Sequence, residues 1–236
     1  VGLSSDDIDY FAQAQNVWKV SLRDMPYVIA QKLPGATTVA ATMRIAAMAG
    51  IKIFATGGIG GVHRGAETTM DISADLTEMG QTNVAIVAAG VKSILDIGLT
   101  LEYMETLGIP VVTFGQEEFP SFYSSKSGFK SPLRLDTPTA IADLLKAKWG
   151  LHLNGSVLIA NPVPTEFEMN QEEIEHHILQ ALEAANQQHI KGKEVTPFIL
   201  KYIANNTQGE SLEANIALIK NNAAVVYVGF KKIKRG

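Results

Sequence analysis

The sequence predicts an α/β fold in which three layers, α/β/α, place helices on both faces of a mixed, mostly parallel sheet. Short apolar runs of strand length alternate with longer stretches of helical periodicity along the chain, an order typical of such sheets. No repeat, low-complexity linker or shift in composition divides the 236 residues, of which 46% are hydrophobic. We therefore expect one α/β/α domain over residues 1–236, with enough apolar side chains for a substantial core.

The strands are predicted from apolar runs bounded by turn residues. They cover residues 51–55, 84–89, 109–114, 157–160 and 224–228. The run 84–89 is continuously apolar, as expected for a strand that helices cover on both faces.

The helices are predicted where a capping residue precedes helical periodicity. Ser4 or Ser5 caps the first helix, Thr37 or Thr38 opens a small-residue helix that Gly50 ends, and Asn170 caps a helix with one apolar face. The predicted helices cover residues 5–15, 24–32, 38–49, 93–107, 137–150, 171–185, 197–206 and 212–221.

Charge and composition exclude several function classes. The formal net charge is −4, although basic residues crowd positions 231–235. A nucleic-acid-binding domain would carry a basic face, so we expect no nucleic-acid partner and interpret the basic end as solvated. No run reaches the ~18 apolar residues of a spanning helix, and the first residues lack a signal-peptide pattern, so we expect no membrane partner. The absence of Cys excludes disulfides, thiolate metal sites and a cysteine nucleophile and favours a cytoplasmic setting.

A glycine-rich loop, residues 56–65, directly follows the strand 51–55 and includes Thr56, His63 and Arg64. It is not a dinucleotide fingerprint, because His63 stands where the third glycine belongs, and the chain holds no phosphate-binding loop motif of the nucleotide hydrolases. Its backbone N–H groups predict a site for an anion such as a sugar phosphate. The alternative is a tight connection with surface charges.

Two carboxylates, Asp71 and Asp75, lie four residues apart in the segment Asp-Ile-Ser-Ala-Asp. They could share a hard cation such as Mg²⁺ or Mn²⁺, or a set of sugar hydroxyls. In the alternative interpretation, Asp71 caps a helix and Asp75 interacts with the helix dipole in the first turn.

Lys92 follows the strand 84–89 by three residues and precedes the helix predicted at 93–107. Its ammonium can lie at the carboxyl edge of the sheet, partly desolvated and near the positive end of a helix, and both effects lower the pKa of a lysine. A lysine that is neutral near pH 7 can attack a sugar C1 to form an imine. The alternative is a solvated lysine. Lys19 and Asn215 also have two interpretations, as ligands of a phosphate and a base or as surface residues.

Six ordered motifs extend over nearly the whole chain. They are residues 35–42 (GATTVAAT), 54–65 (FATGGIGGVHRG), 71–76 (DISADL), 88–93 (AAGVKS), 161–164 (NPVP) and 211–216 (SLEANI). Together they resemble the pseudouridine-5′-phosphate glycosidase family, which includes proteins called indigoidine synthase A-like.

This resemblance implies an α/β/α fold, a homotrimer and dependence on a divalent cation, usually Mn²⁺. The implied activity is the reversible cleavage of the C–C glycosidic bond of pseudouridine 5′-phosphate to uracil and ribose 5-phosphate, which is classed with the carbon–oxygen lyases. Lys92 would be the nucleophile that forms an imine at C1′, and Asp71 would hold the metal. The substrate would contact Lys19, Thr38, Val39, Thr56, His63, Ser73, Ala74, Asp75 and Asn215, with Lys19 on the phosphate and Asn215 on the base.

A C-glycoside has no leaving oxygen to protonate, so an imine at C1′ would act as the electron sink in place of the two-carboxylate scheme of ordinary glycosidases. The carbon of the base must still be protonated, and the family uses a Glu ahead of the position that Val1 matches. We therefore expect the chain to be N-terminally truncated relative to the family, with Glu67, Glu117 and Glu166 as candidate substitutes. A lysine-imine lyase or aldolase acting on a sugar phosphate, and a non-catalytic nucleotide-binding module, are the alternative functions.

Overall fold

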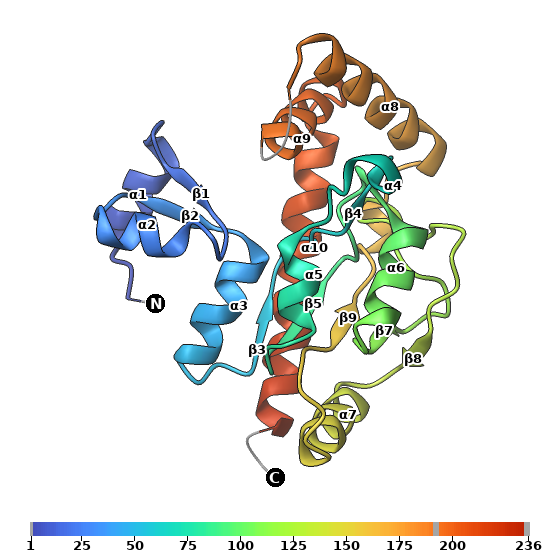
Figure 1. The fold of residues 1–236 in the computed structure, drawn as a ribbon. Helices are drawn as coiled ribbons and strands as arrows, with labels where there is room; N and C mark the ends of the chain where they lie inside the picture. The colour runs from blue at the N-terminus through green and yellow to red at the C-terminus, as the bar shows by residue number, and fades with distance from the viewer. Residues whose placement is uncertain (1, 191–193, 234–236) are drawn as a thin grey trace.

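The computed structural model describes residues 2–190 and 194–233, and a parallel sheet of five strands lies at its centre (Figure 1). The strands are β3 (Ile53–Ala55), β5 (Ala85–Ala88), β7 (Val111–Phe114), β8 (Leu133–Leu135) and β9 (Leu158–Ala160). Their order is β3-β5-β9-β7-β8, and every neighbouring pair is parallel. All five carboxyl ends therefore lie at one edge, where parallel folds place their ligand sites.

Alternate side chains of β5 pack on opposite faces of this sheet. On one face, Ile86 and Ala88 share a buried cluster with α3 (Val39–Met48), α5 (Ala74–Met79) and α6 (Ile97–Thr106). On the other face, Ala85 and Val87 pack with α7 (Pro138–Gly150) and the C-terminal half of α10 (Glu210–Ile233). Helices cover both faces, which confirms the predicted α/β/α fold. Antiparallel pairing of named strands in the described chain is confined to a separate ribbon of β4 (Val62–His63) and β6 (Leu95–Asp96).

A second small sheet precedes the main sheet in the chain. α1 (Ser5–Gln13) leads to β1 (Trp18–Val20), and α2 (Met25–Ala30) connects β1 to β2 (Gly35–Thr37). The two strands pair in parallel, with Lys19 opposite Ala36, and β2 continues directly into α3. Figure 1 shows these elements in blue on one side of the main sheet, with α3 between the two sheets.

Two helices lie beyond the carboxyl edge of the main sheet. After β9, the 3-10 turn η1 (Thr165–Phe167) leads to α8 (Gln171–Gln187), and α8 packs against α9 (Val195–Asn206). Figure 1 shows both helices at the end of the molecule that also holds β4 and α4 (Ala66–Thr69). This pair therefore lies near the loops that leave β3 and β5.

The helix starts predicted from capping residues are confirmed. Ser4 and Asp7 form a reciprocal capping box at α1. The Thr38 and Thr137 hydroxyls accept the N–H groups of the first turns of α3 and α7, and the Asn170 side chain does the same at α8.

Two of the predicted elements are wrong. Residues 224–228 are not a strand but part of α10, where Val225 and Val226 pack against the buried cluster on the sheet, so tertiary packing outweighs their β-propensity. The helix predicted from residue 93 begins at Ile97, because the Asp96 side chain accepts the Leu99 N–H at 2.9 Å and caps it there. The strands β1, β2 and β8 were not predicted because, unlike the equally short β3 and β9, they are mostly exposed and lie in no continuous apolar run. The two-residue strands β4 and β6 were not predicted either.

Among the described helices, none combines the length and apolarity needed to cross a bilayer. Of the basic C-terminal end, residues 231–233 continue α10, whereas Lys234 and Arg235 lie outside the described residues.

Candidate active site

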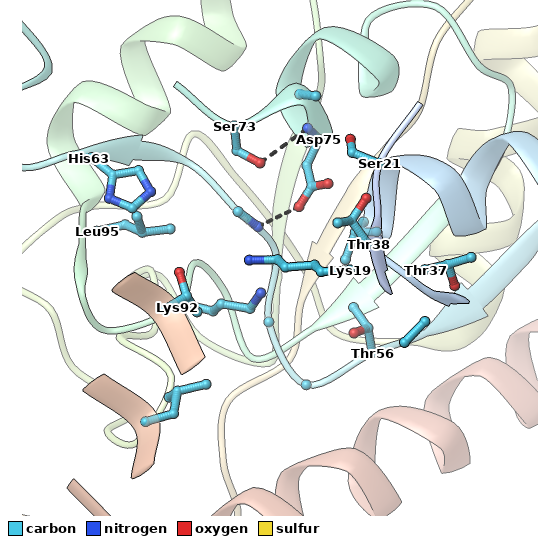
Figure 2. Close-up of a pocket in the computed structure, with 18 of the residues that line it drawn as sticks. Lys19, Ser21, Thr37, Thr38, Thr56, His63, Ser73, Asp75, Lys92 and Leu95 are labelled. Atoms are coloured by element: carbon cyan, nitrogen blue, oxygen red, sulfur yellow. Dashed lines mark hydrogen bonds between the residues drawn. The ribbon is translucent and has the colours of Figure 1, made fainter. Parts of the chain in front are cut away.

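A cavity of about 850 Å³ lies where the loops after β3 and β5 face the small sheet and the N-terminus of α3. It is lined by all the residues to which the family resemblance gives a role, namely Lys19, Thr38, Val39, Thr56, His63, Asp71, Ser73, Ala74, Asp75, Lys92 and Asn215. Figure 2 shows Lys19, His63 and Lys92 around one space, although they come from three different elements. The structure thus brings these residues together, while the chemical part that each plays stays a prediction.

The glycine loop is a wall of this cavity and not a simple surface connection, because residues 58–62 are buried. A Cβ on Gly60 would collide with Ser73 Oγ and reach within 2.7 Å of Asp75 Oδ2. A Cβ on Gly58 would reach within 2.6 Å of the Phe122 ring. Glycine is required here by close packing, at positions whose φ angles are not left-handed.

The same loop runs beside the segment that carries Lys92. The Ile59 N–H donates to the Gly90 carbonyl at 3.1 Å, and the Lys92 N–H donates to the Ile59 carbonyl at 3.0 Å. Gly90 itself has a φ of +93°, and a Cβ there would lie 2.6 Å from the Pro120 carbonyl oxygen. The backbone around Lys92 is therefore fixed by two neighbouring loops.

Asp75 occupies a structural position at the edge of the cavity. Its side chain is 4% exposed; Oδ1 accepts the Ala40 N–H at 2.7 Å, and Oδ2 accepts the Gly60 N–H at 2.8 Å. Ser73 is the N-cap of α5, so the interpretation of Asp71 as that cap is wrong. Sharing of one cation between Asp71 and Asp75 is also disfavoured, because both Asp75 oxygens already accept backbone N–H groups.

Lys92 lies in the turn between β5 and β6 and not at the start of a helix, since α6 begins five residues later. Burial lowers the pKa of its ammonium, the Asp75 carboxylate raises it, and the nearby Lys19 lowers it, with a net lowering. Within the described chain, no hydrogen-bond acceptor or ion-pair partner contacts its Nζ, which is thus available to a ligand. The desolvation expected from the sequence is present, whereas the expected helix dipole is not.

His63 lies beside both lysines on β4. Burial lowers the pKa of its imidazole, Asp71 raises it, and Lys19 and Lys92 lower it further, so the net shift is downward. Its Nδ1 is 3.9 Å from Asp71 Oδ2. A neutral imidazole at pH 7 can accept or donate a hydrogen bond to a sugar or phosphate oxygen.

One part of the cavity combines a lysine with a helix start. Lys19 projects from β1, and Thr38 and Val39 stand at the N-terminus of α3, where backbone N–H groups carry partial positive charge. Because β1 pairs with β2 and β2 continues into α3, the two features belong to one local unit.

Asn215 and Thr56 also line the cavity, where they are tied to the glycine loop and to α10. The Asn215 Oδ1 lies 3.2 Å from where a Cβ of Gly57 would stand. The Thr56 carbonyl accepts a hydrogen bond from the buried Asn222 at 2.8 Å, and Asn222 in turn accepts one from Asn161 at 2.9 Å. The NPVP segment thus supports the glycine loop through α10, which gives this motif a structural part.

Several lining residues were missed by the sequence reasoning. They are Leu95, Phe122, Thr196 and Leu200, among others. Phe122 has a φ of +71°, a conformation rare for an aromatic residue. No sequence pattern marks such a residue, since its conformation follows from the packing of its ring on Gly58.

The carboxylates that line the cavity in the described chain are Asp24, Asp71 and Asp75. Glu67, Glu117 and Glu166, considered as substitutes for the family's acid, do not line it. Within the described residues, no cluster of three or more His, Asp or Glu could hold a metal ion. Asp71 alone, with a side chain 47% exposed, fits a Mn²⁺ or Mg²⁺ ion that keeps most of its water ligands.

Residues 1–227 match the family model described as "Indigoidine synthase A like protein". The chain belongs to this family. Curated members include two proteins named pseudouridine-5′-phosphate glycosidase. The one from Clostridium botulinum is 56% identical over 95% of this chain and 74% of the relative. The one from Geobacillus kaustophilus is 57% identical over 95% of this chain and 75% of the relative.

Solved structures show the same fold within the indigoidine synthase A-like family. An indigoidine synthase A-like protein from Thermotoga maritima has a TM-score of 0.88 and 37% identity over 99% of this chain and 76% of that one. A prealnumycin C-glycosynthase in complex with ribulose 5-phosphate has a TM-score of 0.89 and 36% identity over 99% of this chain and 76% of that one.

Proposed function

We propose that this chain catalyses the reversible cleavage of pseudouridine 5′-phosphate to uracil and ribose 5-phosphate through an imine on Lys92. The observation that carries the proposal is the position of a desolvated Lys92, whose Nζ has no polar partner among the described residues, in the same cavity as Lys19 and the α3 N-terminus. Relatives more than 50% identical bear the name of this activity, and a structural neighbour named a C-glycosynthase binds a pentulose phosphate.

The lining residues suggest which of them would bind the phosphate, the sugar and the base of the substrate. Lys19, Thr38 and Val39 would bind the phosphate, His63 and Ser73 the sugar oxygens, and Asn215 the pyrimidine. The positive charge of Lys19 and of the α3 N-terminus matches a phosphate dianion, and the amide of Asn215 matches the donor and acceptor pattern of uracil. Such a placement would bring C1′ to the middle of the cavity, beside Lys92.

In the cleavage direction, Lys92 Nζ forms a bond to C1′ as the ribose ring opens, and the ring oxygen O4′ takes up a proton. The C1′–C5 bond then breaks with its electron pair passing into the base ring, while the nitrogen lone pair forms the C=N bond of the imine. C5 of the released uracil carries a proton in place of the sugar, and water hydrolyses the imine to ribose 5-phosphate. The neutral amine that the first step needs is favoured by the lowered pKa of Lys92.

Asp75 has both oxygens committed to backbone N–H groups and no Glu of the described residues lines the cavity, so neither supplies the proton to C5. A divalent cation, Mn²⁺ by the family resemblance, would be held by Asp71 and would supply positive charge near the substrate. We also propose a homotrimer, which light scattering of the purified protein tests.

Trapping of the imine tests the proposal. The protein is incubated with ribose 5-phosphate and borohydride and then mapped by peptide mass spectrometry, and we expect one adduct, on Lys92. Lys148 is the internal control, because it is also buried with a lowered pKa but lies outside the cavity, with Nζ donating to the Asn154 carbonyl at 2.9 Å. An adduct on another lysine, or none, would overturn the assignment.

Product analysis separates the alternative functions. With ribose 5-phosphate, uracil and Mn²⁺, formation of pseudouridine 5′-phosphate supports the proposed reaction. Retro-aldol fragments of ribose 5-phosphate would indicate an aldolase, and binding without an adduct or product would indicate a nucleotide-binding module.

A further inference from the structure

Arg64 forms a fork-shaped ion pair that the proposed reaction does not use. Its Nη1 donates to Glu175 Oε1 at 2.5 Å, and its Nη2 donates to Glu175 Oε2 at 2.9 Å. Nη2 also lies 3.5 Å from the Ser93 carbonyl oxygen. Arg64 does not itself line the cavity, so it acts on a ligand only through its neighbours.

These neighbours are parts of the candidate site. Arg64 directly follows His63 in the chain, and Ser93 directly follows Lys92. Glu175 lies on α8, and α8 packs against α9, which contributes Thr196 and Leu200 to the cavity wall. One guanidinium therefore joins two segments that place side chains at the cavity, those of His63 and Lys92, to α8, the helix on which the cavity-lining α9 packs.

Among the ion pairs between described residues, only Arg64–Glu175 connects α8 or α9 with the strand-bearing part of the molecule. The others lie within the small sheet region, between α3 and α5, between β4 and the residues that follow it, or between β8 and the residue that follows it. The hydrogen bonds and charge of Glu175 raise the pKa of Arg64, burial lowers it, and the charge of Asp96 raises it further. The net shift of the pKa is upward, so the guanidinium stays charged. A planar two-bond contact also fixes the orientation of α8, which a single lysine bond would not do.

We propose that Arg64 is a positioning residue that holds the α8–α9 unit, residues 171–187 and 195–206, over the cavity and so fixes Thr196 and Leu200 opposite Lys92 and His63. The proposal rests on the sugar-phosphate function assigned above, since its effect is read on that ligand. The pair is half-exposed, with side-chain exposures of 32% and 43%. A modest effect on ligand binding is therefore expected, and not loss of the fold.

The test is Glu175→Gln, which keeps the size of the side chain and removes its charge. We expect the half-saturating concentration of ribose 5-phosphate in imine trapping to rise about fivefold, with the maximal trapping rate changed less than twofold, as for loss of one partly exposed ion pair. Arg64→Lys keeps the charge and loses the fork, so an intermediate shift is expected. The matched control is Asp136→Asn, which breaks the exposed Arg134–Asp136 pair far from the cavity and should change neither value.

Hydrogen–deuterium exchange gives a readout that does not depend on the reaction. In Glu175→Gln, amide exchange in residues 195–206 should increase relative to wild type, while exchange in α7 is unchanged. Unchanged exchange in residues 195–206 would overturn the proposal. Faster exchange with an unaltered half-saturating concentration would overturn it too, because the pair would then serve stability alone. Failure of the wild-type protein to form any adduct would instead contradict the proposed function.

Discussion

Gly60 and Asp75 are joined by a buried hydrogen bond, in which the Gly60 N–H donates to Asp75 Oδ2 at 2.8 Å. The other oxygen of the same carboxylate accepts the Ala40 N–H at 2.7 Å. Asp75 thereby connects the start of α3 to the glycine loop, and with them the two ends of the cavity.

Asp75→Ala should destabilise the protein by about 3 kcal/mol, because two buried N–H groups lose their acceptor. The free energy of unfolding, measured in urea, checks this. Asp143→Asn, an exposed position on α7, is the control and should change stability by less than about 0.5 kcal/mol. Equal stabilities of the two variants would show that the Asp75 contacts contribute little.

Gly60→Ala should distort the glycine loop, because its Cβ would collide with Ser73 and approach Asp75 to 2.7 Å. We expect lower stability and loss of ribose 5-phosphate binding, measured by calorimetry. Gly150→Ala, at the end of α7, adds a Cβ that meets nothing within 4 Å and should be neutral or stabilising. Normal binding by Gly60→Ala would disprove the packing argument.

Lys92→Met should stabilise the folded protein at pH 7. The folded state lowers the pKa of Lys92, so a protonated Lys92 favours the unfolded chain, and this cost disappears as the pH rises above the unfolded pKa. The gain in melting temperature over wild type should therefore be largest at neutral pH and shrink toward pH 10. Lys130→Met, at an exposed loop lysine, should show no such trend. A constant gain at all pH values would assign the effect to packing.

Lys19→Met should shift imine formation to higher pH. The Lys19 charge lowers the pKa of Lys92 and of His63, so its removal raises both, and Lys92 becomes neutral at a higher pH. Loss of a charged contact to phosphate should also raise the half-saturating ribose 5-phosphate concentration about tenfold. Borohydride trapping across a range of pH and of ribose 5-phosphate concentration measures the pH shift and the half-saturating concentration. A shift to lower pH would contradict the electrostatic assignment.

Asp71→Asn should weaken Mn²⁺ binding by at least about tenfold, as measured by electron paramagnetic resonance of free Mn²⁺. The same change removes the charge that raises the pKa of His63, so the imidazole should titrate at lower pH in NMR spectra. Glu67→Gln, on α4 outside the cavity, is the matched control. Unchanged Mn²⁺ affinity would place the metal elsewhere.

Much of the fold could be predicted from the sequence where the signal is local. Caps such as Ser4, Thr38 and Asn170 act within one helical turn, and the apolar run of β5 is readable because both faces of that strand are buried. The run at 224–228 misled the prediction because β-branched residues also suit a helix that packs on a sheet.

For the site, the motif resemblance singled out residues that line one cavity, but their contacts could not be predicted. Asp75 reaches Ala40 across 35 positions, and Arg64 reaches Glu175 across 111. Neither spacing follows a local period of helix or strand. Only the folded chain therefore shows that the Asp75 carboxylate is committed to backbone N–H groups. The strained Phe122 is likewise a result of packing against Gly58.

Lys19 and Lys92 belong to two different sheets, one carried by β1 and the other following β5. The distance between the proposed phosphate ligand Lys19 and the proposed nucleophile Lys92 is consequently set by how the small sheet and α3 dock on the main sheet, and not by either lysine. The way in which the small sheet and α3 dock on the main sheet would then determine which chain lengths of sugar phosphate the cavity accepts. Substitutions at the α3–α5 contact, such as the pair of the exposed Arg44 with the buried Glu78, would change the accepted length while leaving both lysines in place.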